Sequence, residues 1–531
     1  MSETKKYLLV LSIGPVQGFI AAARKTRDLW FGSHLLSEIS KATAMAIKGN
    51  NADLVFPGIE NDKELQLNSN GSIANVILAV VKGDPQQIAK HAKNRANEAW
   101  RMFASDAIKE VEKLSNGKEV IRNDIWDQQV NDFVEFYAAW VPYDGSEYNA
   151  KRNRVMRLLA GRKNCHDFRQ EKGDAGFPKS SLDGSRDTVL KENLPEAFRQ
   201  NLHIRDGEQL DAIGVVKRFA ARKKFPSLGE IAIDPWRRNP KNLSTIINDE
   251  LDDIDEDAQL RKAAEKSPYL AILRADGDRM GKAISEQKTP EEHRELSVAL
   301  SNFAKGVPTI FEECHGVCVY SGGDDVLGFL PLDMALDCAR KLHDDFKTNL
   351  NRYEGVSLSV GLVVGHYHEM LENLLEYARI AEQTAKKANG NAPPFGDRNG
   401  LAVRTYHRSG SPCGVREQWS NDKKDKNSLD NRLIAWSELF AKEDAEKNSI
   451  PMKFPYDLRD FAKRFVKAEI SIPGGFISSN ALQIMKQKRF ECENLSDRLK
   501  KIDDVQSLLS FADELLIAQM IGDAIKLAKE R

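Results

Sequence analysis

Two strand-like segments of similar sequence constrain the fold of this chain more than any other feature. YLLVLSIG at residues 7–14 and YLAILRAD at residues 269–276 align without a gap, and the second carries Asp276 where the first carries Gly14. Each segment is followed by helix and strand patterns that are typical of a ferredoxin-like unit. We therefore expect a duplicated α+β fold with two ferredoxin-like domains.

The expected elements follow from the spacing of apolar residues. In the first unit they are strands at 7–13, 72–83 and 132–143 and helices at 15–48 and 84–114. In the second unit they are a strand and a helix within 269–284, a helix at about 290–313, a hairpin at 317–330, a helix at 333–352, a strand at 356–366, a helix at 369–390 and a strand at 400–410.

The length of 531 residues is typical of about three to four domains. We expect a first sheet domain at 1–145, a middle domain at 146–265, a second sheet domain at 266–410 and a C-terminal helical domain at 411–531. The middle domain is basic and ends in an acidic segment, 248–267, which is a candidate linker.

Composition excludes some classes of protein. The 78 Lys and Arg residues balance the 79 Asp and Glu residues, so net charge favours no partner. The chain has no apolar run of about 18 residues and no signal-peptide pattern, so we expect a soluble cytoplasmic protein that does not bind a membrane. None of its six cysteines forms a C-x-x-C pair, so we expect neither a zinc site nor a disulfide framework, and we interpret Cys314 and Cys318 as core thiols.

The segment VCVYSGGDDVLGFL at 317–330 places two glycines and two acids between strand-like halves. In a ferredoxin-like sheet the first strand neighbours this hairpin, so we expect Asp276 beside Asp324 and Asp325. Three carboxylates at one sheet edge repel one another unless cations bind, and Mg²⁺ prefers carboxylates together with phosphate oxygens. The pattern predicts a metal site at which Asp324 and Asp325 are catalytic and all three acids are ligands. A simple turn is the competing interpretation of the four residues.

Other residues near these acids are candidates for nucleotide binding. They are Gly277, Asp278, Ser321, Gly322, Gly323 and Lys386. The glycines allow a nucleotide to approach the backbone. Lys386 supplies positive charge for phosphates, although Lys387 is an equal candidate by position. Asp278 has an alternative role as the N-cap of the following helix.

Five basic residues of the middle domain are weak candidates for RNA binding. They are Arg152, Arg154, Arg162, Lys217 and Arg218. Their positive charges suit phosphate contacts, and a solvated charged surface explains them equally well.

Four motifs in this order carry a resemblance to a known family: LSIGPVQGFIAAARKTRDLWFGSHLLSEI, SSLDGSRDTVL, LRADGDRMGKAI and YSGGDDVLGFLPL. Together they resemble the large subunit of type III CRISPR effector complexes, of the III-B or Cmr kind. The resemblance covers residues 7 to about 410.

The resemblance implies two palm (cyclase-like) domains, of which the second makes cyclic oligoadenylate from ATP with Mg²⁺ or Mn²⁺. It implies that synthesis begins after the complex pairs its CRISPR RNA with a target RNA, so the expected partners are both RNAs and the other subunits. Asp276, Asp324 and Asp325 match the metal positions. Gly14 lies in the degenerate first palm, which would help to hold the second ATP.

Two departures from the family pattern matter. Met1 lies just before the first palm, and His-Asp dipeptides occur at 166–167 and 343–344 without a nuclease-like setting, so we expect no HD nuclease activity. FPKSSLDG carries serines where relatives hold zinc through cysteines, so we expect no zinc. Three alternatives stay open: a stand-alone diguanylate-type cyclase, a structural subunit with an inactive palm, and a synthase that joins ATP to another acceptor such as S-adenosylmethionine.

Overall fold

The structure is a computed structural model of the full chain. It describes residues 5–529 except 51, 70, 166–175, 193, 195, 203, 222–223, 240–264, 388–396, 409–410, 443–448, 467–472 and 474. Most of the expected acidic linker and the first His-Asp dipeptide, at 166–167, lie outside the described residues.

The first sheet contains four antiparallel strands in the order β2-β3-β1-β4. The strands are β1 (Lys6–Gly14), β2 (Asp53–Phe56), β3 (Val76–Lys82) and β4 (Glu135–Pro142). Alternate residues of β1 face opposite sides, as in any strand. Leu9 and Leu11 pack in the core that includes α2 (Thr26–Lys48) and α3 (Pro85–Leu114), whereas Leu8 and Val10 pack with α5 (Tyr148–Asn164). Both faces of this sheet are therefore covered.

Several details of the first unit differ from the expected elements. The helix at 15–48 is two helices, α1 (Gln17–Ala21) and α2, because the backbone at Ala22 and Lys25 leaves the helical conformation. β2 was not expected, since it is only four residues long. α5 packs against β4 and β1 although it follows the expected boundary at 145, so that boundary separates a helix from its sheet.

The second sheet contains six strands in the order β10-β9-β8-β5-β7-β6. They are β5 (Tyr269–Asp278), β6 (Val317–Gly322), β7 (Asp325–Pro331), β8 (Ser357–His366), β9 (Gly400–Thr405) and β10 (Cys413–Gln418). Its helices are α12 (Met280–Glu286), α13 (Pro290–Glu313), α14 (Ala335–Asn349) and α15 (Leu371–Lys386). The order β8-β5-β7-β6 repeats the order β4-β1-β3-β2 of the first sheet. The expected α+β fold with two ferredoxin-like units is confirmed.

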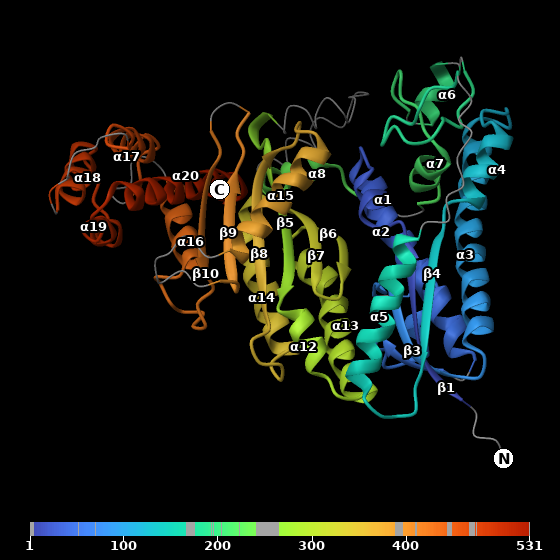
Figure 1. Cartoon of the computed structure of the whole chain (residues 1–531). Coiled ribbons are helices and arrows are strands. Elements are labelled where there is room, and N and C mark those ends of the chain that lie inside the picture. The colour runs from blue at the N-terminus through green and yellow to red at the C-terminus, as the bar shows by residue number, and fades with distance from the viewer. Residues whose placement is uncertain are drawn as a thin grey trace.

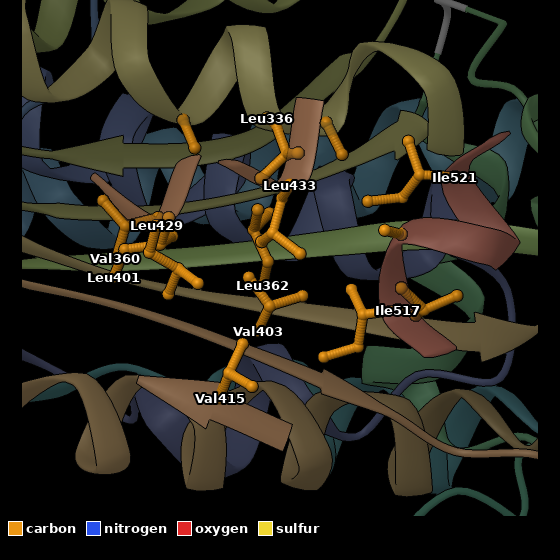
Figure 2. Packing of buried hydrophobic residues seen from close by; sticks show 14 of the residues in the cluster. Leu336, Val360, Leu362, Leu401, Val403, Val415, Leu429, Leu433, Ile517 and Ile521 are labelled. Atoms are coloured by element: carbon orange, nitrogen blue, oxygen red, sulfur yellow. The ribbon is translucent and has the colours of Figure 1, made fainter. Parts of the chain in front are cut away.

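The C-terminal region combines a strand with a helical bundle. β10 lies in the polar start of this region and pairs with β9 across the expected boundary at 410, so the second sheet extends past that boundary. The helices are α16 (Leu429–Phe440), α17 (Phe454–Lys463), α18 (Phe476–Gln487), α19 (Glu493–Lys500) and α20 (Val505–Lys529). Figure 2 shows Ile517 and Ile521 of α20 beside Leu362 and Val403 of the sheet and Leu433 of α16. The bundle is thus anchored on one face of the second sheet.

The segment between the two sheets contributes short helices. They are α6 (Glu196–Asn201), α7 (Ala212–Phe219), α8 (Leu228–Ala232) and α9 (Asp234–Arg237). α7 contacts α2, α3 and α4 (Asn123–Asn131) of the first unit, whereas α8 contacts β5 and β7 of the second. This segment therefore touches both sheet units, which lie side by side in Figure 1.

Direct contacts also join the two units. Arg294 of α13 donates through Nε to Leu54 O of β2 at 2.6 Å. The hydroxyl of Ser297 accepts from Gly58 N at 2.5 Å, just after β2.

None of the helices in the described part of the chain is long and apolar enough to cross a membrane.

Not all thiols occupy the core. Cys314, Cys338 and Cys413 are buried, and Cys318 and Cys492 are half-buried. Cys314 belongs to the core, as expected, and Cys318 packs against it, whereas Cys165 is exposed at the end of α5.

Candidate active site

The hairpin between β6 and β7 presents an open glycine turn. Gly322 pairs with Asp325, which leaves Gly323 and Asp324 as the two turn residues. Gly323 has a φ of 89°, a conformation that favours glycine. A β-carbon on Gly322 or Gly323 would meet nothing within 4 Å. The backbone at these two glycines is therefore open to a ligand.

The sheet register brings the three expected acids together. β5 pairs with β7 as far as Ala275 and Val326, so Asp276 and Asp325 follow at the same edge. The two carboxyl groups interact through a hydrogen bond, and burial together with this contact raises the pKa of Asp325. Burial, followed by the charge of Asp276, raises the pKa of Asp324 to about 6. Asp324 and Asp325 are thus desolvated carboxyl groups whose charged forms are disfavoured beside Asp276.

Lys386 is the lysine that reaches this site. Its ammonium forms an ion pair with Asp276, and Nζ lies 2.8 Å from Glu382 Oε1. Hydrogen bonds and charges of these two acids raise its pKa, although burial acts in the opposite direction as the largest single contribution. Lys387 is exposed after the end of α15. The geometry therefore favours Lys386 over Lys387.

Asp278 has a structural role instead of the expected ligand role. Its Oδ2 accepts hydrogen bonds from the hydroxyls of Ser357 and Ser359, each at 2.8 Å, and from Asn399 N at 2.9 Å. The residue is fully buried. The N-cap position of α12 is Arg279, without a side-chain cap. Both the nucleotide-binding and the N-cap assignments of Asp278 are wrong, because the side chain fastens β5 to β8.

Ser321 is also committed to the interior. Its hydroxyl donates to Ala304 O of α13 at 2.8 Å, and the residue is 2% exposed. Its side chain therefore attaches the hairpin to α13, and the assignment of this side chain to nucleotide binding is wrong.

Gly14 lies in the corresponding place of the first sheet. It ends β1 opposite Glu135 of β4, and a β-carbon on it would be 3.0 Å from Glu135 Oε2. The next residue, Pro15, lines a pocket of about 200 Å³ together with Glu135, Asp183 and Lys217. Gly14 thus lies beside a polar pocket of the first unit, and its role toward an acceptor nucleotide stays a prediction.

The expected RNA-binding residues divide into two groups. Arg152, Lys217 and Arg218 are buried, so their assignment to RNA contacts is wrong. Arg154 is exposed, whereas Arg162 is half-buried and donates to Cys165 O at 2.6 Å. Of the five residues, only Arg154 and Arg162 expose surface that a phosphate could contact.

Internal partners explain the burial of these cations. Arg152 donates to Ile284 O, and Lys217 donates through Nζ to Ala22 O at 2.9 Å. Arg218 forms ion pairs with Asp28 at 2.8 Å and Glu208 at 2.9 Å. Burial lowers the pKa of Lys217 to about 8. These cations fasten neighbouring segments to each other.

Sequence inspection missed three residues around the acids: Arg274, Tyr320 and Glu382. Arg274 lies two positions before Asp276 and therefore on the same face of β5. Glu382 lies four positions before Lys386 and therefore on the same side of α15. Burial raises the pKa of Tyr320 to about 12, and nearby acids act in the same direction. The spacing of Arg274 from Asp276 and of Glu382 from Lys386 could therefore have predicted that these two residues lie near the acids.

Comparisons with known proteins match two regions of the chain. Residues 8–105 match the family described as CRISPR-associated protein Cmr2, N-terminal. Residues 269–393 match the family described as Cas10/Cmr2, second palm domain. This matched region contains Asp276, the glycine hairpin and Lys386.

Individual proteins agree with these matches. The CRISPR system Cmr subunit Cmr2 of Pyrococcus furiosus is 24% identical, with 76% of this chain and 62% of that protein covered. The chain thus spans less than two thirds of this relative. The type III-B Cmr-beta structure bound to cognate target RNA matches with a TM-score of 0.62 and 15% identity over 93% of this chain and 79% of that chain. The Csm1–Csm4 cassette in complex with cA4 matches with a TM-score of 0.52 and 14% identity over 97% and 70%. Both matched regions occur in one chain with two ferredoxin-like units, so the chain is Cmr2-like and contains a region that matches the second palm domain of Cas10/Cmr2.

Proposed function

We propose that this chain is a nucleotidyltransferase that joins ATP into cyclic oligoadenylate once its complex has bound a target RNA. One observation carries the proposal: Asp276, Asp324 and Asp325 meet beside an open glycine turn, and Lys386 approaches them from α15. Acids, a cation and an open backbone are the groups needed to hold a metal-bound triphosphate.

The donor set fits a hard divalent cation. Among the described residues, no three His, Cys, Asp or Glu side chains form a ready metal cage, so phosphate oxygens would complete the coordination. Asp276, Asp324 and Asp325 would hold Mg²⁺ or Mn²⁺, which would activate a ribose hydroxyl and stabilise the pyrophosphate that leaves. Burial of Asp324 and Asp325 disfavours their charged forms when no cation is bound, and this favours metal binding.

The residues of the chain supply positioning. The open surface at Gly322 and Gly323 accommodates the nucleotide against the backbone, and Lys386 neutralises phosphate charge. The first sheet unit, with Gly14 in place of the acid, would present the acceptor nucleotide. Holding both nucleotides in one orientation accounts for much of the expected rate.

The expected partners are CRISPR RNA, target RNA and other subunits of a type III-B complex. The Pyrococcus relative is named as a Cmr subunit, and a structure of similar fold contains target RNA. The similar Csm1–Csm4 cassette was determined with cA4, which supports an adenylate product.

Mass spectrometry of products from the assembled complex tests the proposal. With ATP, Mg²⁺ and matching target RNA, we expect cyclic oligoadenylate, and we expect little product from the isolated chain. A guanylate product from GTP would identify a diguanylate-type cyclase instead. An adduct with S-adenosylmethionine would identify a conjugating enzyme. Equal synthesis by the isolated chain with ATP alone would contradict control by RNA.

A further inference from the structure

Glu382 connects two cations at the edge of the acidic site. Its Oε2 lies 2.7 Å from Arg274 Nε, and its Oε1 lies 2.8 Å from Lys386 Nζ. The side chain is only 8% exposed. A carboxylate buried to this extent needs such partners to offset its lost hydration. Both of its oxygens are therefore committed to cations that border the site.

The two cations reach the acids from different elements. Lys386, at the end of α15, forms an ion pair with Asp276. Arg274 lies on β5 two residues before Asp276, and the charge of Asp325 is among those that act on its guanidinium. Glu382 therefore fixes the positive charges beside Asp276 and Asp325 at once.

We propose that Glu382 is a positioning residue that holds Lys386 at the metal and triphosphate site. Without a metal ion, Lys386 acts as the counter-ion of Asp276. If Asp276 instead held a divalent cation, the ammonium of Lys386 would retain its ion pair with Glu382, which would keep it within reach of a triphosphate. The inference rests on the proposed function in taking a divalent cation and a nucleoside triphosphate as the ligands.

The physical reason lies in the lysine side chain. A lysine has a flexible four-carbon stem, and fixing it on a ligand costs conformational entropy. The pair Glu382 and Lys386 has the favourable order of an i,i+4 ion pair on a helix, with the acid first. Holding the ammonium in place before the ligand binds reduces that entropic cost.

A purely structural role for Glu382 makes a different prediction. The helix is packed tightly at this point, since a β-carbon on Gly361 of β8 would be 2.3 Å from Glu382 N. Glu382→Gln keeps the shape of the side chain and this packing, but removes the charge. If Glu382 only supports packing, this variant should bind ligands as the wild-type chain does.

Binding measurements on the full-length chain test the inference without any turnover. Mn²⁺ binding is followed by electron paramagnetic resonance, and binding of Mn²⁺–ATP by equilibrium dialysis. The variants are Glu382→Gln, Lys386→Met and the double variant. Glu376→Gln is the matched control, because Glu376 is an exposed acid of the same helix that pairs with Arg379 at 2.5 Å.

We expect Lys386→Met to bind Mn²⁺ alone about fivefold more tightly, because the competing ammonium is gone. We expect Glu382→Gln and Lys386→Met each to weaken Mn²⁺–ATP binding by about three- to tenfold. The double variant should be no weaker than Lys386→Met, because Glu382 acts through the lysine. Glu376→Gln should match the wild-type chain.

Three outcomes would overturn the inference: wild-type Mn²⁺–ATP binding by Glu382→Gln, additive losses in the double variant, or equal losses in Glu376→Gln. Failure of the proposed synthesis would be distinguishable from each of them. In that case the complex would make no oligoadenylate, while the binding changes and their non-additivity would persist.

Discussion

Gly277 and Asp324 are in direct contact between β5 and the hairpin turn. A β-carbon on Gly277 would lie 2.7 Å from Asp324 Cβ and 2.8 Å from Met280 Cγ. The strand therefore approaches the turn as closely as it does only because residue 277 is glycine. Asp276 directly precedes Gly277 in β5, so this contact sets how near Asp324 lies to Asp276.

Gly277→Ala should reduce product synthesis by at least about tenfold, because the added methyl group displaces Asp324 by a distance that matters for catalysis. Product is measured by mass spectrometry with target RNA present. Gly281→Ala is the control, since a β-carbon there meets nothing within 4 Å. Wild-type synthesis by Gly277→Ala would show that the position of Asp324 is unimportant.

Replacing both Asp324 and Asp325 with Ala should abolish product while complex assembly and RNA binding stay unchanged. The two carboxyl groups are desolvated and repel Asp276, so the metal-free chain should unfold at an equal or higher temperature after their removal. Product assays and thermal unfolding measure the two effects. Full product from the double variant would refute the assignment of the active site.

Gly14→Asp should lower product yield without creating a second metal site. The new side chain would begin 3.0 Å from Glu135 Oε2 and add a charge next to that acid. Gly14→Ala controls for the added β-carbon alone. If Gly14→Asp makes less product than Gly14→Ala while RNA binding is unchanged, the result would support an acceptor role for the first unit. If Gly14→Asp makes as much product as the wild-type chain, the first unit serves only as a scaffold.

Acidification should destabilise the contact between the two sheet units through His293. Its Nδ1 lies 2.7 Å from the Tyr148 hydroxyl, and burial, followed by the charge of Arg152, lowers the pKa of His293 to about 4. Between about pH 6.5 and pH 4 the unfolded chain binds the proton that the folded chain does not, so stability falls as pH falls. The loss from pH 7 to pH 5 should be about 1–2 kcal/mol.

Chemical denaturation at the two pH values measures this effect. His293→Gln retains a polar side chain that does not titrate, so its stability should change less between pH 7 and pH 5. An equal pH dependence in the variant and the wild-type chain would assign the effect to other groups.

Arg218→Met should destabilise the fold by about 3 kcal/mol or more, because it leaves Asp28 and Glu208 without their shared cation. Arg154→Ala, at an exposed position of α5, should leave stability within about 0.5 kcal/mol of wild type. Urea denaturation compares the two. A stable Arg218→Met chain with weakened RNA binding would restore the RNA-binding assignment of Arg218.

The sequence alone determined the features that depend on local pattern. Alternating apolar residues and matching strand segments were sufficient for the duplicated ferredoxin-like units, since strand period and connection order leave few topologies. The same topology placed Asp276 beside Asp324 and Asp325, because the first strand and the hairpin are neighbours in this sheet. The short β2 and the polar β10 lacked a strong pattern, and their pairing with longer strands stabilises them.

Only the tertiary structure decided which charged residues are buried. Lys217 and Arg218 belong to a helix, α7, whose residues are all buried, yet by sequence they resemble a basic surface patch. The partner Asp28 of Arg218 is 190 residues away. Asp278 likewise finds Ser357 and Ser359 on a strand 79 and 81 residues further along. A charge enters the interior only where distant groups offset its desolvation, and those partners are chosen by chain packing rather than by neighbouring sequence.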